Sequence, residues 1–156
     1  MKQEADNRPT QEDAWPRRWV RRVAGLLRRG TGGEAHRQKL GPRAELEATR
    51  HLQQNGYKIL ERNFRATHGE VDLVVFKDGT VVFVEVRSRT EPAEPDPLYS
   101  VTGKKQKRVI RAAQSYVNRA GLWREDVQLR FDVVAIRYDQ EGNLTGLQHI
   151  QDAFHT

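Results

Sequence analysis

Two apolar segments that meet at a tight turn constrain the fold of this chain more than any other feature. Residues 69–77 and 80–87 are rich in valine and other strand-forming residues, and Asp78-Gly79 joins them. A two-residue turn of type I′ requires positive φ at both central residues, which Asp and Gly adopt more readily than most residues. The sequence therefore predicts an antiparallel hairpin in which Lys77 faces Thr80.

The register of this hairpin brings acidic side chains together. Counting back from the turn places Asp72 opposite Glu85 and Glu70 opposite Arg87. Because side chains alternate along a strand, these four are expected on one face, near the end far from the turn. Directly opposed like charges destabilise a sheet, and a hard cation such as Mg²⁺ would offset the repulsion between Asp72 and Glu85.

The alternative is that Asp72 and Glu85 are ordinary residues at strand ends, which share a proton or pair with nearby Arg side chains. The surrounding sequence weakens this interpretation, because the other residues of 71–76 and 81–86 are apolar on both faces. In a sheet covered on both sides, the burial of such carboxylates costs free energy unless they are paired with a cation or coordinate a metal.

Composition and charge bound the class of protein. The 156 residues suit one domain, and the absence of cysteine excludes disulfides, thiolate zinc sites and a cysteine nucleophile. Residues 1–40 hold ten Lys and Arg against five Asp and Glu, whereas residues 41–156 hold seventeen against sixteen. A basic tail on a near-neutral domain indicates a polyanionic partner. The apolar run 23–27 is too short to span a bilayer, so we expect a cytoplasmic protein without stable membrane insertion.

A glycine-containing joint near residues 30–33 divides the chain. Residues 1–38 are expected to form a basic, partly disordered extension, and residues 39–156 the folded domain. Within the extension, Trp15, Trp19 and Leu26 recur at helical spacing among arginines. This pattern indicates either a short basic amphipathic helix or a solvated segment with a transient helix.

Further elements are expected on both sides of the hairpin. The first predicted helix is 42–56, with an inward stripe of Ala44, Ala48 and Leu52. The second is 102–120, with an apolar stripe of Val109, Ala112, Ala113, Tyr116, Val117 and Ala120. The predicted strands are 57–65, 127–137 and 144–150. The proline-rich segment 91–97 cannot be regular structure, and it leaves the strand that carries Glu85. We interpret it as a flap that contacts substrate.

Charged side chains on the two predicted helices are candidates for the same site. Glu45 lies about 60° from the centre of its helix's inward stripe and can reach the sheet, although a glutamate in a first turn also suits the helix dipole. The opening turns of the second helix carry a basic cluster, which consists of Lys104, Lys105, Lys107, Arg108 and Arg111. A helix N-terminus with such a cluster suits phosphate groups of a nucleic acid, and a merely solvated basic face is the alternative.

Several short motifs occur in order along the predicted domain. They are Gly-x-x-x-Glu-x-x-Ala at 41–48, Gly56-Tyr57, Asn63-Phe64-Arg65, Gly69-Glu70-Val71-Asp72-Leu73-Val74, Val82-Phe83-Val84-Glu85-Val86-Arg87 and Arg130-Phe131-Asp132-Val133-Val134-Ala135. Together they resemble the bacterial YraN family of predicted endonucleases. The resemblance covers about residues 38–156, and residues 1–37 match no part of it.

The resemblance implies a restriction-endonuclease-like α/β fold, in which a mixed central sheet is flanked by helices, similar to archaeal Holliday-junction resolvases. In that pattern Asp72 and Glu85 match the metal-binding carboxylates, and Glu45 matches a helix-borne glutamate of the resolvase-like branch. Arg87 matches a position that lysine usually holds in this fold. The resemblance therefore implies that the catalytic residues are Asp72, Glu85 and Arg87. Arginine in place of lysine at this position is a departure from the pattern on which the standard mechanism depends.

We therefore expect a metal-dependent endonuclease that hydrolyses phosphodiester bonds in structured or branched DNA, with Mg²⁺ or Mn²⁺ as cofactor. The expected partner is a nucleic acid, and we expect DNA rather than RNA. A homodimer is compatible with this function. The alternative is an accessory protein that binds nucleic acid on a nuclease scaffold without catalysis, since a fold does not determine activity. An adaptor recruited to a membrane surface by the basic extension is the third hypothesis.

Overall fold

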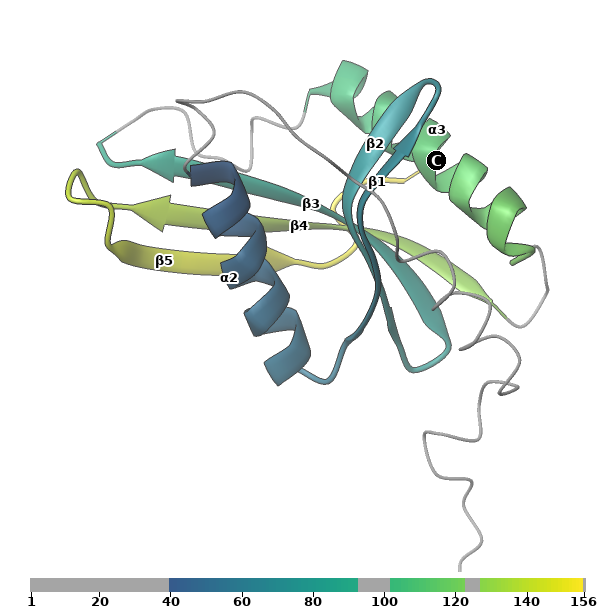
Figure 1. Ribbon diagram of the computed structural model, residues 1–156, viewed down its shortest axis with the longest axis horizontal. Helices are drawn as coiled ribbons and strands as arrows, with labels where there is room; N and C mark the ends of the chain where they lie inside the picture. Colours follow the sequence, from purple (N-terminus) through teal and green to yellow (C-terminus); the bar gives the residue numbers. More distant parts are fainter. Residues whose placement is uncertain (1–39, 93–101, 123–126, 156) are drawn as a thin grey trace, which may run out of the picture.

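A five-stranded sheet with one helix on each face forms the described part of the chain (Figure 1). The computed structural model describes residues 40–92, 102–122 and 127–155. The elements in chain order are α2 (Leu40–Gln54), β1 (Lys58–Ala66), β2 (Gly69–Lys77), β3 (Thr80–Thr90), α3 (Gly103–Ala120), β4 (Gln128–Tyr138) and β5 (Leu144–Ile150). Both predicted helices and all predicted strands are present, within a few residues of their expected bounds.

Two predicted features fall outside these ranges. The basic extension, residues 1–38, is not among the described residues, and neither is most of the predicted flap at 91–97. Within the part of the chain that the structure describes, no helix combines the length and apolar character needed to span a membrane.

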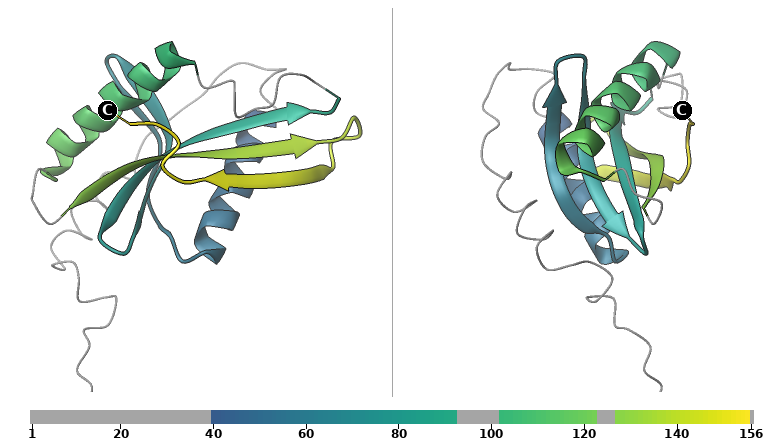
Figure 2. Two further views of the ribbon diagram at one scale, coloured as in Figure 1. Left: turned by 180° about the vertical axis from the view of Figure 1, so that it is seen from behind. Right: turned by 90° about the vertical axis from the view of Figure 1, so that its right-hand side faces the viewer.

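The sheet is mixed, as predicted. Its strand order is β1-β2-β3-β4-β5, and every neighbouring pair is antiparallel except β3 and β4. Parallel neighbours need a long crossover, and α3 lies in the connection between them. The two views of Figure 2 show α2 and α3 against opposite faces of the sheet. The α/β class is therefore confirmed.

The two helices use the predicted stripes to bury the two faces. Ala44, Ala48 and Leu52 of α2 pack with Val75, Val82 and other residues on one face. The other face is covered by the buried residues of α3, which are Val109, Ala112, Ala113, Tyr116, Val117 and Ala120. An apolar stripe of this kind stabilises a helix mainly through tertiary packing rather than intrinsic propensity.

The central hairpin forms with the predicted turn and register. Asp78 and Gly79 have φ of 48° and 78°, and Lys77 pairs with Thr80. The pairing of β2 with β3 continues to Leu73 and Val84. It thus reaches the position next to the predicted pair of carboxylates.

Beyond Leu73 the sheet forks. β2 stays with β1 as far as the pair of Gly69 with Ala66, while β3 stays with β4 as far as the pair of Thr90 with Tyr138. In Figure 1 the β1–β2 ribbon bends away from β3 and β4. β1 has a positive φ of 51° at Asn63, which lies between the residues that pair with Leu73 and Val71.

The fork corrects one prediction. Among the described residues, Glu70 does not pair with Arg87 in the sheet, because the β2–β3 register ends earlier; Glu70 pairs with Arg65 of β1, and Arg87 pairs with Ala135 of β4. The simple alternation of faces also fails here. Val71 belongs to the core under α3, whereas Leu73, two residues along, belongs to the core under α2.

Candidate metal and nucleic-acid site at the strand fork

Asp72 lies at the point where β2 leaves β3. Its Oδ2 accepts a hydrogen bond from the backbone N–H of Val86 at 2.8 Å. A partly buried backbone N–H needs a hydrogen-bond acceptor. The regular β2–β3 pairing ends at Leu73 and Val84, and beyond it the Asp72 carboxylate is the acceptor for Val86. The local fold therefore holds the Asp72 carboxylate beside β3, one residue from Glu85.

Glu85 is the most buried acidic group at the fork, with only 1% of its side chain exposed. Lys105 Nζ makes an ion pair with its Oε1, and Arg87 Nε lies 3.6 Å from the same oxygen. Oε2 of Glu85 has no hydrogen-bond donor among the described residues. A buried carboxylate is costly unless its charge and lone pairs are compensated, so Glu85 has capacity for another cationic ligand.

Burial and a neighbouring charge together disfavour the ionised form of Asp72. The pKa of Asp72 is raised from its ordinary value of 3.8 to about 7, first by burial and then by the negative charge of Glu85. The Val86 N–H and the Lys105 ammonium act against this shift. In the absence of metal, the structure therefore favours a proton on this carboxylate near neutral pH.

This raised pKa predicts how stability depends on pH. Between about pH 4 and pH 7 the folded protein retains a proton on Asp72 that the unfolded chain releases. Stability from this group is therefore present at low pH and is lost as pH rises through about 7. Asp72→Asn keeps an acceptor for Val86 but removes the titration. In chelator, we expect the variant's Tm to exceed the wild-type Tm at pH 8, with the gain shrinking toward pH 5; a gain independent of pH would contradict this.

Glu45 reaches the fork from α2, as its position on the helix predicted. Asn63 Nδ2 donates a hydrogen bond to Glu45 Oε2 at 2.9 Å. Burial raises the pKa of Glu45, this hydrogen bond lowers it, and the charge of Asp72 raises it again. Glu45 and Asp72 therefore lie within electrostatic reach of each other.

The donor set at the fork suits a divalent cation with few protein ligands. Within residues 40–92, 102–122 and 127–155, no group of three or more His, Asp and Glu side chains converges as a metal-binding cluster. Asp72 and Glu85 remain as a pair, and Mg²⁺ commonly takes only one or two carboxylates, with water and phosphate oxygens completing its shell. The Oε2 of Glu85, which has no hydrogen-bond donor among the described residues, fits this role. The assignment of Glu45 as a third ligand stays a prediction.

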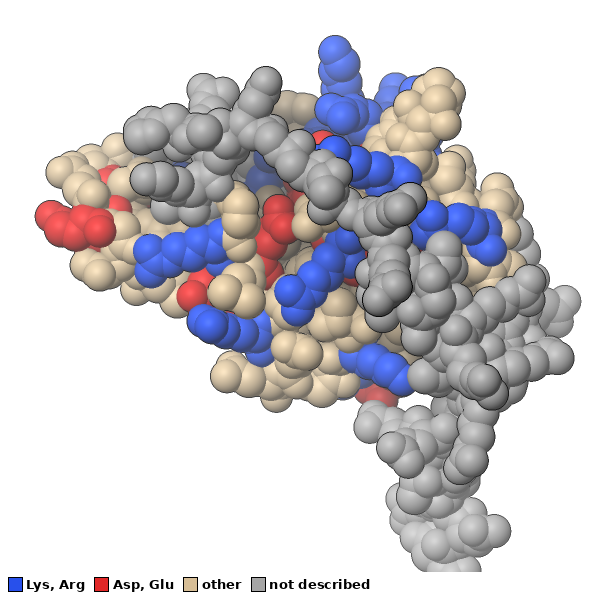
Figure 3. Space-filling model, in the orientation of Figure 1, with Lys and Arg blue, Asp and Glu red and all other residues tan. Residues whose placement is uncertain are grey.

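The predicted basic cluster of α3 is divided by the structure. Lys105 points to Glu85, and Arg108 Nη2 lies 3.7 Å from Glu70 Oε1. Lys104 and Lys107 are exposed. Figure 3 shows acidic side chains near the middle of one face, with Lys and Arg side chains on several sides of them. This charge arrangement is compatible with a polyanion that approaches the acidic centre.

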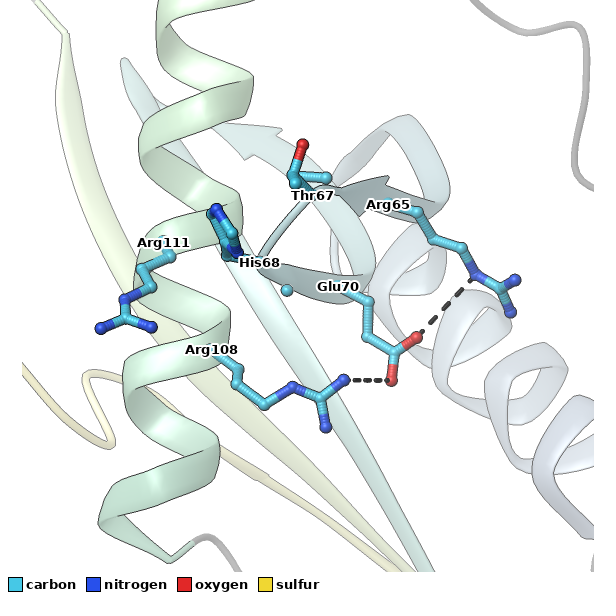
Figure 4. Close-up of a pocket in the computed structure, with 8 residues that line it drawn as sticks. Arg65, Thr67, His68, Glu70, Arg108 and Arg111 are labelled. Atoms are coloured by element: carbon cyan, nitrogen blue, oxygen red, sulfur yellow. Dashed lines mark ion pairs between the residues drawn. The ribbon is translucent and has the colours of Figure 1, made fainter.

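A basic pocket adjoins the fork. Its volume is about 490 Å³, and it is lined by Arg65, Ala66, Thr67, His68, Gly69, Glu70, Arg108 and Arg111. Figure 4 shows the side chains of the β1–β2 turn on one side and those of α3 on the other, with Glu70 joined to Arg65 and Arg108 by ion pairs. Glu70 is the only carboxylate among these lining residues, so the pocket has an excess of positive charge.

Two of these residues, Arg65 and His68, were not predicted to belong to a basic site. In the sequence, Arg65 is part of the Asn63-Phe64-Arg65 motif, and His68 is a lone histidine in a predicted turn. The spacing of Arg108 and Arg111 predicts that they share a helix face. Only the packing of the β1–β2 turn against α3 brings Arg65 and His68 to them.

Gly69 allows that packing. A Cβ at this position would lie 2.0 Å from the backbone oxygen of Arg108, too close for any real contact. We therefore expect Gly69→Ala to destabilise the protein by roughly 1–3 kcal/mol, the usual cost of overpacking. Gly41→Ala is the matched control, because a Cβ there meets nothing within 4 Å. Urea denaturation tests this, and equal midpoints for the two variants would contradict it.

The fold and the fork together define an α/β protein with a paired-carboxylate site bordered by basic side chains. The model of the uncharacterised protein family UPF0102 matches residues 44–136, and the chain belongs to this family. This confirms the resemblance to the YraN family.

Relatives of similar length support the assignment. A UPF0102 protein of Chlorobium chlorochromatii is 39% identical over 120 residues, covering 74% of this chain and 91% of the relative. One of Stutzerimonas stutzeri is 42% identical over 119 residues, covering 76% and 97%. One of Geobacter metallireducens is 38% identical over 119 residues, covering 76% and 94%. Family membership by itself assigns no activity.

Proposed function

We propose that this protein is a metal-dependent endonuclease of the restriction-endonuclease-like class that hydrolyses phosphodiester bonds in structured or branched DNA. One observation carries the proposal: Asp72 and Glu85 lie close enough at the strand fork for the charge of Glu85 to raise the pKa of Asp72, and Oε2 of the buried Glu85 has no hydrogen-bond donor among the described residues. A purely structural carboxylate in a covered sheet would be expected to have donors for both oxygens.

Asp72 and Glu85 would hold Mg²⁺ or Mn²⁺, with Glu45 as the third candidate ligand. When bound, such an ion polarises a phosphate and lowers the pKa of an attacking water. The residues around it then have distinct tasks. The Val86 N–H holds Asp72 in place. Arg87, whose Nε lies 3.6 Å from Glu85, would stabilise the negative charge that develops on a phosphate beside the ion.

Arg87 limits how the proton of the attacking water can leave. An arginine guanidinium cannot give up its proton in a protein, so this side chain can orient or stabilise groups but cannot act as a base. The proton therefore leaves to bulk water in this proposal. The same feature favours the second candidate function, an accessory protein that binds nucleic acid without cutting it.

Nucleic-acid binding in this proposal uses the basic pocket as well as α3. The sequence predicted Lys104, Lys107, Arg108 and Arg111, and Arg65 joins them because it lines the pocket beside the fork. Contacts of this kind hold the phosphate backbone and carry no direct sequence information. They would position a strand without selecting its sequence.

A cleavage assay tests the activity. The full chain is incubated with labelled single-stranded, duplex, flap and four-way-junction DNA in Mg²⁺, Mn²⁺ or chelator. We expect cleavage of the branched substrates only when metal is present. Cleavage that survives chelation would overturn the metal mechanism, and binding without cleavage in any metal would favour the accessory function.

A charge reversal tests the role of the pocket. Arg111→Glu should weaken binding to all four DNA shapes and lower the slope of log K against log salt by about one or more, because phosphate contacts release counterions. Arg50→Glu on the exposed side of α2 makes the same charge change away from the pocket. Fluorescence anisotropy at several salt concentrations measures both. Equal losses in the two variants would indicate an effect of net charge alone.

A further inference from the structure

Lys105 occupies the place next to Glu85 where a metal ion would be expected. Its backbone belongs to the first turn of α3, where its N–H bonds to the Thr102 carbonyl oxygen at 2.8 Å. Its side chain reaches inward, so that Nζ forms an ion pair with Glu85 Oε1. The sequence predicted a different role for Lys105, a contact with nucleic-acid phosphate.

The two partners differ in how freely they can move. Glu85 lies in the middle of the sheet with 1% of its side chain exposed, whereas 29% of the Lys105 side chain is exposed. A lysine ammonium sits on a flexible four-carbon stem and is strongly hydrated, so it can exchange a carboxylate for solvent. Arg87 lies on the same strand as Glu85 and is 3.6 Å from the same oxygen.

A divalent cation on Glu85 would meet this ammonium directly. A cation on either oxygen of this carboxylate would lie close to the ammonium on Oε1, and two positive groups on one carboxylate repel each other. Oε2 has no hydrogen-bond donor among the described residues, which leaves room for a stronger ligand than Lys105 alone. Lys105 therefore compensates the buried charge only in part.

We propose that Lys105 is the internal counter-ion of the metal-free site and is displaced from Glu85 when a divalent cation binds. The displaced ammonium remains at the N-terminus of α3, beside Lys104 and near the basic pocket, where a nucleic-acid phosphate can bind it. Metal and nucleic acid then favour each other's binding, because the phosphate gives Lys105 a new partner and such coupling is reciprocal. This inference rests on the proposed metal site but not on catalysis.

Calorimetric titration of the full chain with Mn²⁺ tests the displacement without DNA. Lys105→Gln removes the charge and keeps an amide donor for Glu85. We expect it to bind Mn²⁺ about tenfold more tightly than wild type, the size of effect that one adjacent charge commonly has on proton binding by a carboxylate. Lys104→Gln, the exposed neighbour, should bind Mn²⁺ as wild type does, and so should Lys105→Arg, which keeps the charge.

A labelling measurement tests the same displacement in the wild-type chain, so the inference does not depend on a variant that folds. A lysine-reactive reagent followed by mass spectrometry should modify Lys105 several-fold faster when Mg²⁺ is present, with the rate at Lys104 unchanged. Equal rates at Lys105 with and without Mg²⁺ would overturn the inference.

The coupling has its own test. DNA with uncleavable phosphorothioate linkages should tighten Mn²⁺ binding by the wild-type chain, and should do so less in Lys105→Gln.

The outcomes separate this inference from the proposed function. If Glu85→Gln abolishes Mn²⁺ binding while Lys105→Gln leaves the affinity unchanged or weaker, the metal site stands and the role of Lys105 is wrong. If neither the wild-type chain nor Lys105→Gln binds Mn²⁺, the proposed metal site itself fails, and the inference fails with it.

Discussion

Asp72→Asn and Glu85→Gln should each lower DNA cleavage by at least about a hundredfold while leaving DNA binding, measured in chelator, unchanged or tighter. Removal of residues that merely support metal ligands already costs about 10- to 100-fold, so loss of a ligand should cost at least as much. Binding should not weaken, because each substitution removes a negative charge that would face the phosphate backbone. Asn at position 72 can still accept the hydrogen bond from Val86.

The measurement is a single-turnover cleavage rate in Mg²⁺ or Mn²⁺ together with DNA affinity by anisotropy. Glu47→Gln is a suitable control, because this carboxylate lies on α2 and pairs with Arg50 rather than with the fork. Thermal denaturation in chelator confirms that each variant is folded. Parallel loss of cleavage, binding and stability would show that the two carboxylates are structural.

Arg87→Ala should reduce cleavage by about a hundredfold or more, as removal of one donor that stabilises transition-state charge commonly does. Arg87→Lys should retain the activity or raise it, because lysine keeps the positive charge. The Nε of Arg87 is buried and has no hydrogen-bond acceptor within the described part of the chain, although it lies 3.6 Å from Glu85. This geometry leaves the Nε–H available to a ligand that enters the site.

A structural ion pair is the competing interpretation of Arg87. The structure changes its partner from the predicted Glu70 to Glu85, since Glu70 pairs with Arg65 and Arg108 instead. If Arg87 only neutralises Glu85, Arg87→Ala should lower the Tm and leave the cleavage rate of the folded fraction unchanged. Rates normalised to the folded fraction, measured beside Arg87→Lys, distinguish the two roles.

Local patterns in the sequence determined most of the secondary structure. The turn at Asp78-Gly79 predicts the hairpin register correctly as far as Leu73 and Val84. Helical spacing likewise predicts which residues of α2 and α3 are buried. These features depend on neighbours along the chain, or across a two-residue turn, where backbone preference and side-chain period leave few alternatives.

Tertiary structure alone decided the geometry of the candidate site. The predicted register requires β2 and β3 to stay paired along their whole length. Instead, β2 bends away with β1 beyond Leu73, and Asp72 bonds to β3 through its side chain. Likewise, no pattern within α3 could distinguish Lys105, which reaches Glu85, from its exposed neighbour Lys104. Where a strand forks and which basic side chain turns inward depend on how separate elements pack, and sequence spacing does not encode that packing locally.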